Sequence, residues 1–110
     1  MSFLLHFARA LQIRSMQTNA QFEMMCISNQ QSMITNRIAE LEKTAKSLDK
    51  DNPEIKTIQC NKQMLVSMSN ALDMRLKLLQ TRVQTLSAEE QTLEKVLPDE
   101  VARSAPKYCA

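Results

Sequence analysis

The residues of this chain that could do acid–base, nucleophilic or metal chemistry are few and scattered. Its 110 residues contain one histidine, His6, and three cysteines, and they contain no glycine. No pair of these residues has the spacing of a zinc site, and a glycine-rich phosphate loop is impossible without glycine. The carboxylates alternate with lysines at helical surface spacing, which is typical of a solvated face. The sequence therefore predicts no enzyme, no metal and no cofactor.

The cysteines and the charge exclude two further classes. The helical register derived below separates Cys26 from Cys60 by about 25 Å, far beyond disulfide reach. Three free thiols in a reducing compartment are expected, with an intermolecular disulfide through Cys109 as the alternative. A net charge of +2 with interleaved signs gives no phosphate-binding stripe, and Tyr108 and three phenylalanines offer little base stacking. Nucleic acid is not an expected partner.

The dominant pattern is a pair of apolar heptad repeats on either side of one polar break, residues 49–53. In steps of three and four from Ala10 to Leu48, every position is apolar except Gln17 and Gln31. From Ile55 to Leu93 the exceptions are Lys62, Ser69 and Glu90. Each of these polar positions has an apolar counterpart when the second repeat folds back along the first, so that Leu48 faces Ile55, Ile38 faces Leu65 and Ile27 faces Leu76.

This pattern predicts an all-α fold, a long antiparallel two-helix coiled-coil hairpin in one domain, 1–110. The first helix is expected over about 3–48, because no proline or glycine interrupts it. The turn follows at 49–53, where Asn52 and Pro53 suit a new helix start. The second helix is expected over about 54–97, since Pro98 cannot donate a backbone hydrogen bond, and residues 98–110 are expected to form a short tail.

A second set of apolar residues lies in the middle of both helices, outside the two heptad repeats. One interpretation is a wide core face, and the other is an interface with another chain. Solvated helix faces carry Lys and Glu, yet from Ser15 to Asn36 the only formal charge is Glu23, which favours the interface. The residues expected to contact other subunits or a partner are Phe22, Met25, Met33, Met64, Met68, Met74 and Leu78.

The apolar amino-terminal stretch, residues 3–11, is a separate candidate surface. His6 and Arg9 interrupt it and no basic leader precedes it, so a secretory signal is not expected. The expected location is cytoplasmic, or outside after export by a signal-less route. As a helix the stretch presents Phe3, Phe7 and Leu11 on one face, for docking on another subunit or, less favoured, for lying in a membrane interface.

The turn also carries a resemblance. A glycine-free hairpin with Asp51-Asn52-Pro53-Glu54 at its polar turn resembles the needle and inner-rod subunits of bacterial type III secretion systems over residues 39–79. The resemblance implies hairpins that polymerise helically around a lumen. The chain is longer than those subunits and has a proline near its carboxyl end. It is similar to the WXG100 class in size and shape only, because it lacks the Trp-x-Gly turn.

Together these features predict a structural protein that self-associates into a filament or another helical homo-oligomer. The alternative is a small secretion chaperone or adaptor whose Met-rich groove binds a helix of another protein. A third possibility is a peripheral membrane protein anchored through residues 3–11.

Overall fold

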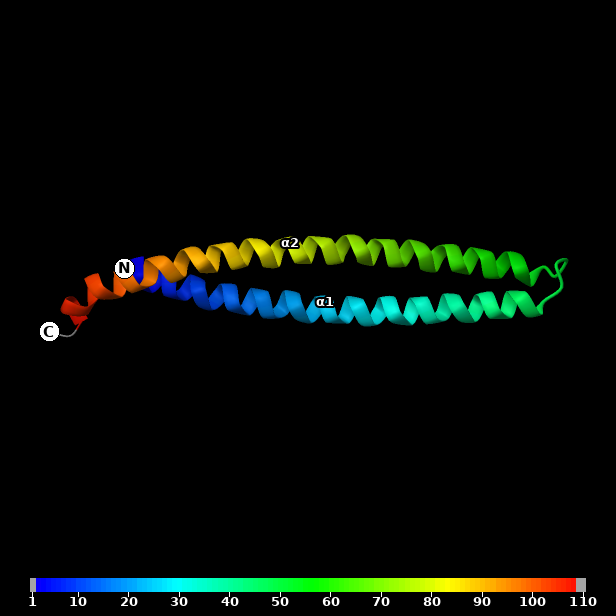
Figure 1. Cartoon of the computed structure of the whole chain (residues 1–110), viewed down its shortest axis with the longest axis horizontal. Coiled ribbons are helices and arrows are strands. Elements are labelled where there is room, and N and C mark those ends of the chain that lie inside the picture. Colours follow the sequence, from blue (N-terminus) through cyan, green and yellow to red (C-terminus); the bar gives the residue numbers. More distant parts are fainter. Residues whose placement is uncertain (1, 109–110) are drawn as a thin grey trace. The chain divides into compact units, whose positions relative to one another are not determined.

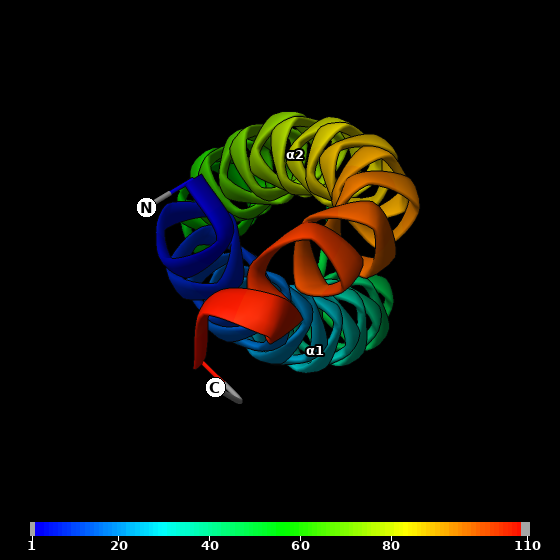
Figure 2. The same cartoon turned by 90° about the vertical axis from the view of Figure 1, so that its left-hand side faces the viewer.

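The computed structural model contains two helices, α1 (Ser2–Ser47) and α2 (Glu54–Tyr108). They lie side by side and run in opposite directions (Figures 1 and 2). The structure describes the backbone of residues 2–108 and the side chains of residues 3–99 and 101–102. Cys109, the residue considered for intermolecular pairing, lies outside the described residues. The predicted all-α antiparallel hairpin is confirmed.

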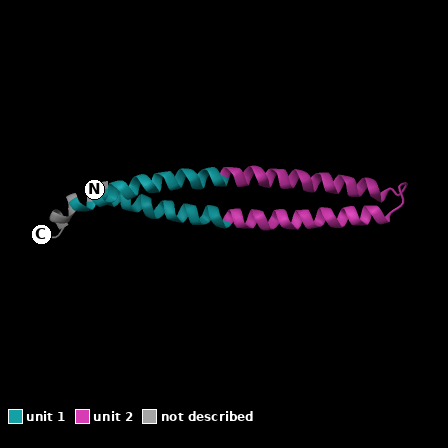
Figure 3. Cartoon of the chain, in the orientation of Figure 1, with its two compact units in different colours: residues 1–22, 79–110 teal, residues 23–78 magenta. Residues whose placement is uncertain are grey.

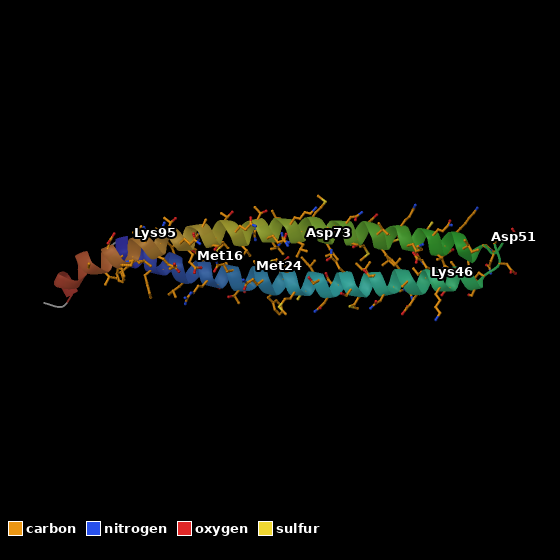
Figure 4. All side chains as sticks on the ribbon, viewed as in Figure 1. Met16, Met24, Lys46, Asp51, Asp73 and Lys95 are labelled. Atoms are coloured by element: carbon orange, nitrogen blue, oxygen red, sulfur yellow. The ribbon has the colours of Figure 1, made fainter. Side chains whose placement is uncertain are left out.

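Two compact units divide the chain, and each contains a segment of both helices (Figure 3). Unit 1 comprises residues 1–22 and 79–110, and unit 2 comprises residues 23–78 with the turn. In each unit the side chains between the two helix segments form the core (Figure 4).

The heptad seam is the buried surface in both units. Every residue of the two repeats, from Ala10 to Leu48 and from Ile55 to Leu93, is buried or half-buried. The most buried residues recur every seven positions on α1, which is the spacing of one heptad position in a coiled coil. On α1 they are Ile13, Ala20, Ile27, Ile34 and Leu41, and on α2 they are Ile58, Leu79, Leu86 and Leu93. We call this surface the inner seam.

In unit 1 the inner seam is densest around Ile13. Ile13 is fully buried and packs with Leu86 and Leu93 from α2. Three half-buried residues, Ala10, Met16 and Leu97, surround this cluster. This contact explains how a chain with two helices and no third layer still encloses apolar side chains.

Two polar residues of the inner seam in unit 2 are accommodated by the opposite helix. The Gln31 amide Nε2 donates a hydrogen bond of 2.7 Å to Asp73 Oδ1. Lys62 Nζ lies 3.2 Å from Glu42 Oε1. Each seam residue thus reaches a carboxylate at the edge of the seam, which avoids the cost of burying an unpaired polar group.

The turn begins α2 with a side-chain cap. The Asn52 Oδ1 atom accepts a 2.9 Å hydrogen bond from the backbone N–H of Glu54, and Pro53 occupies the first position of the new helical turn. The backbone N–H of Asn52 donates a 3.0 Å hydrogen bond to the carbonyl of Asp49, which tightens the turn. α1 ends at Ser47 and α2 begins at Glu54, close to the predicted boundaries.

Replacing Asn52 by alanine is expected to lower the free energy of unfolding by about 1 kcal/mol, because the Glu54 N–H loses its side-chain acceptor. Asn52→Asp is the matched control, since aspartate caps equally well. Urea unfolding followed by circular dichroism measures both variants. Equal losses from Asn52→Ala and Asn52→Asp would show that the side-chain cap is not what stabilises the turn.

The predicted end of the second helix at Leu97 is wrong. α2 continues through Pro98 to Tyr108, so the expected tail is helical at positions 98–108 (Figure 1). A proline inside a helix removes one hydrogen bond and strains the preceding turn, but a helix accommodates it by bending. Leu97 packs against the core of unit 1 and holds the chain up to the proline.

Candidate assembly surface

Two arginine–glutamate pairs cross between the helices beside the inner seam, one in each unit. In unit 1, Arg9 Nε and Nη2 donate to the two carboxylate oxygens of Glu89 at 2.7 and 3.0 Å. In unit 2, Arg75 Nε and Nη2 donate to the carboxylate of Glu23 at 2.8 and 3.2 Å. Bidentate pairs of this kind fix orientation as well as adding attraction, so they support the antiparallel register.

The same contacts shift the protonation equilibria. Hydrogen bonds from Arg9 lower the pKa of Glu89 below its ordinary value, although partial desolvation opposes the shift. The bond to Glu89 raises the pKa of Arg9, and the bond to Glu23 raises the pKa of Arg75.

A pH dependence of stability follows from Glu89. Its folded pKa lies below its unfolded pKa, so its stabilising effect is complete above the unfolded value and is lost as the pH falls through the folded value. We expect Glu89→Gln to reduce the thermal midpoint at neutral pH and to make no difference in acid below the folded pKa. Thermal unfolding over a pH series tests this, with Arg9→Gln as the reciprocal variant. A constant difference between wild type and Glu89→Gln at all pH values would contradict it.

The residues predicted to form an interface in the middle of the chain are exposed. Their exposed fractions run from 51% to 73%, so none of them belongs to a wide core face covered within the hairpin. The residues are Phe22, Met25, Met33, Met64, Met68, Met74 and Leu78. Exposed apolar side chains in this number are suggestive of assembly or of partner binding.

These residues do not share one face. On α2 in unit 2, six uncharged and exposed residues follow each other in steps of four and three, and we call them the outer stripe: Cys60, Met64, Ser67, Ala71, Met74 and Leu78. Each lies two positions after an inner-seam residue. Two residues turn a helix by about 200°, so the outer stripe lies on the side of α2 opposite the inner seam. Met64, at the edge of the stripe, also borders α1. Cys60, Ser67 and Ala71 are not among the predicted contact residues, and this spacing identifies them.

The corresponding outward positions of α1 in unit 2 are more polar. Cys26 and Met33 alternate there with Asn29 and Asn36, and the row ends in Glu40 and Lys43. Met25 and Met68 lie off both outward rows, each on a flank of its helix. The two helices therefore present unequal outer surfaces, and α2 carries the more apolar one.

A shallow Met-lined groove joins the two helices in unit 2. One hollow of about 430 Å³ is lined by Met33, Arg37 and Leu65, among others. A second, of about 210 Å³, shares Arg37 and Leu65 and adds Met64 and Met68. The groove thus brings together Met33, Met64 and Met68, three of the predicted contact residues.

The remaining predicted residues, Phe3, Phe7 and Leu11, belong to unit 1, as does Phe22. The rings of Phe3 and Phe7 stack with centroids 6.0 Å apart. Phe7 and Leu11 then line a cavity of about 240 Å³ with Leu93 and Leu97, whose charged rim includes Arg14 and Glu94. The amino-terminal face is therefore partly folded onto α2 of its own hairpin.

The few charged residues in the middle of unit 2 are hydrogen-bonded within the hairpin. Between positions 23 and 36 of α1, and between 63 and 76 of α2, the charged residues are Glu23, Asp73 and Arg75. Glu23 is bonded to Arg75, and Asp73 accepts the hydrogen bond from Gln31. Glu23 and Arg75 neutralise each other, whereas Asp73 keeps its charge beside a neutral amide, so the stretch presents one net charge for another chain to cover.

The described residues hold neither a metal-binding cluster nor a membrane-spanning helix. Cys26 and Cys60 are exposed free thiols, and His, Cys, Asp and Glu side chains do not gather in threes or more to hold a metal ion. Among the same residues, neither helix has a stretch with both the length and the apolar character needed to cross a bilayer.

Comparison of the chain with protein-family models, with curated proteins and with solved structures finds no match.

Proposed function

We propose that this chain is a structural protein whose hairpins self-associate through the outward apolar residues of unit 2, building a filament or another helical homo-oligomer. The observation that carries the proposal is the run of exposed Met and Leu side chains on a stretch with few charged residues, of which Glu23 and Arg75 form an ion pair within the hairpin. Catalysis has no part in this function.

The energetics favour assembly. Each fully buried Leu or Met side chain contributes about 1.5–3 kcal/mol relative to its exposed state. A hairpin has a single seam to offset the conformational entropy of its residues, so its stability as a monomer is marginal. When other copies cover a second apolar surface, more apolar area is buried and no further residues have to be ordered.

The filament form of the proposal draws on the resemblance of the turn to needle and inner-rod subunits. Asn52 caps α2 and Pro53 follows it, which supports a compact, solvent-facing turn. Charged residues gather near the turn, among them Lys46 and Asp51 (Figure 4). In such an assembly the turn would face solvent while the uncharged stretch packs against neighbouring subunits.

A second candidate function is that of an adaptor that holds a helix of another protein. The Met-lined groove between α1 and α2 favours this reading, because methionine side chains adapt to different partners. An adaptor would remain a discrete small species until its partner is added.

Sedimentation velocity and negative-stain electron microscopy over a concentration series separate the two functions. Self-assembly predicts particles that grow with concentration in the absence of any partner. Lys46→Glu, near the turn, is the control substitution and should leave this growth unchanged. A species of constant small mass at every concentration would overturn the assembly proposal.

A further inference from the structure

We propose that the first step of assembly is a two-fold dimer in which the outer stripe of α2 packs antiparallel against the outer stripe of a second copy. This inference rests on the proposed function and names the surface and the partner. The two hairpins would then form a row of four helices with α2 and its symmetry mate at the centre.

The outer stripe has the spacing of a second coiled-coil seam. Its steps of four and three are those of the inner seam, displaced to the opposite side of α2. In the structure all six side chains are exposed, so α2 has one apolar face covered by α1 and a second one uncovered. A helix with two such faces is suited to the interior of a bundle rather than to its surface.

The stripe is complementary to itself when a second copy runs in the opposite direction. Leu78 of one copy then meets Cys60 of the other, Met74 meets Met64, and Ala71 meets Ser67. The small residues fall together at the centre, where they let the helices approach closely, and the large residues fall together on either side. A contact in which each pair occurs twice is the signature of a two-fold interface.

Charge selects the antiparallel arrangement over the parallel one. The residues beside the stripe include two positive ones, Arg75 and Lys77. In a parallel pair, Arg75 of one copy would lie level with Arg75 of the other, and Lys77 would lie level with Lys77. The antiparallel pair separates the two Arg75 side chains by about 18 Å along the axis, beyond the screening length in physiological salt. It sets Arg75, already bonded to Glu23, level with the uncharged Gln63 of the second copy.

The corresponding row on α1 fits this role poorly. Self-pairing of α1 would bury Asn29 and Asn36 at alternate layers. A buried amide without a hydrogen-bond partner costs free energy. The outer stripe of α2 contains no amide, and its one polar oxygen is the hydroxyl of Ser67. The apolar residues of α1 are therefore left for a second contact that joins dimers into larger assemblies.

Disulfide cross-linking of the full-length chain tests the arrangement. In a background with Cys26→Ala and Cys109→Ala, Cys60 is the remaining thiol, and Leu78→Cys adds a second one. The two positions are about 27 Å apart on their own helix, so a disulfide can form only between copies. We expect the Leu78→Cys chain to form a covalent dimer under a glutathione redox buffer, at least about tenfold faster than the control.

The matched control is Thr85→Cys in the same background. This residue is exposed and lies one heptad beyond Leu78, which displaces it by about 10 Å from the Cys60 of a second copy. A second test pair, Met64→Cys with Met74→Cys in a Cys60→Ala background, should cross-link in the same way. Both pairs use exposed positions, so folding of the hairpin is preserved.

The possible results distinguish a failure of the proposed dimer from a failure of the proposed self-association. Rapid dimer formation through Cys60 alone would indicate a parallel pair and overturn the inference. Assemblies in sedimentation without cross-links at either test pair would place the contact on another surface and leave the proposed function standing. A chain that is monomeric at all concentrations would overturn both.

Discussion

Replacing Ile13 by alanine is expected to lower the free energy of unfolding by about 2 to 5 kcal/mol, the largest stability effect of any single substitution proposed for this chain. Ile13 has no exposed surface and packs with Leu86 and Leu93. Removing its outer carbons leaves a cavity between two helices that are held apart by their other seam residues. The lost contacts cannot be replaced by a third layer, because the hairpin has none.

Thermal and urea unfolding followed by circular dichroism measure this effect. Ile13→Val keeps most of the volume and should cost about 0.5 to 1.5 kcal/mol. Leu11→Ala is the matched exposed control, since Leu11 is 54% exposed on the same helix. If Leu11→Ala destabilised the chain as much as Ile13→Ala, the amino-terminal face and not the inner seam would be the main source of stability in unit 1.

Replacing Met74 by glutamate is expected to weaken self-association by roughly a thousandfold while leaving the helices intact. Met74 is 73% exposed in the hairpin, so the carboxylate is fully solvated in the monomer. In the proposed dimer the substitution places a charge opposite Met64 in two symmetry-related layers. Each layer loses apolar burial and gains an unpaired charge, and the two penalties act together.

Sedimentation equilibrium gives the dissociation constant, and circular dichroism reports helicity. Met74→Leu is the conservative control and should retain association, since it keeps a large apolar side chain at that layer. Met25→Glu, on α1, is expected to block the larger assemblies and to spare the dimer. Undiminished association of Met74→Glu would remove the outer stripe from the interface.

The sequence by itself determined the hairpin and the surface buried inside it. An apolar repeat of three and four fixes which side of a helix must be covered, and this holds whatever the partner helix is. When one polar break separates two such repeats, antiparallel pairing of the two helices is the simplest arrangement that covers both apolar sides. The sequence also predicted the helix start at Asn52, because helix capping depends on residues within a single turn.

The end of α2 could not be read from local rules. Pro98 predicts a helix end when its neighbours alone are considered, but the contact of Leu97 with the core of unit 1 stabilises the helix up to that point. Beyond it α2 continues to Tyr108, because a proline inside a helix removes one hydrogen bond and strains the preceding turn, and a bend can accommodate both effects.

The tertiary structure alone decided how the polar groups and the outward residues are disposed. The pairs Arg9–Glu89 and Glu23–Arg75 depend on which flanks of two helices meet, and composition does not reveal that. The off-seam methionines formed one set in the sequence, yet the structure distributes them between the outer stripe, the groove and the flanks. The physical reason is that periodicity fixes the direction of a side chain on its own helix, whereas exposure and pairing depend on what the second helix covers.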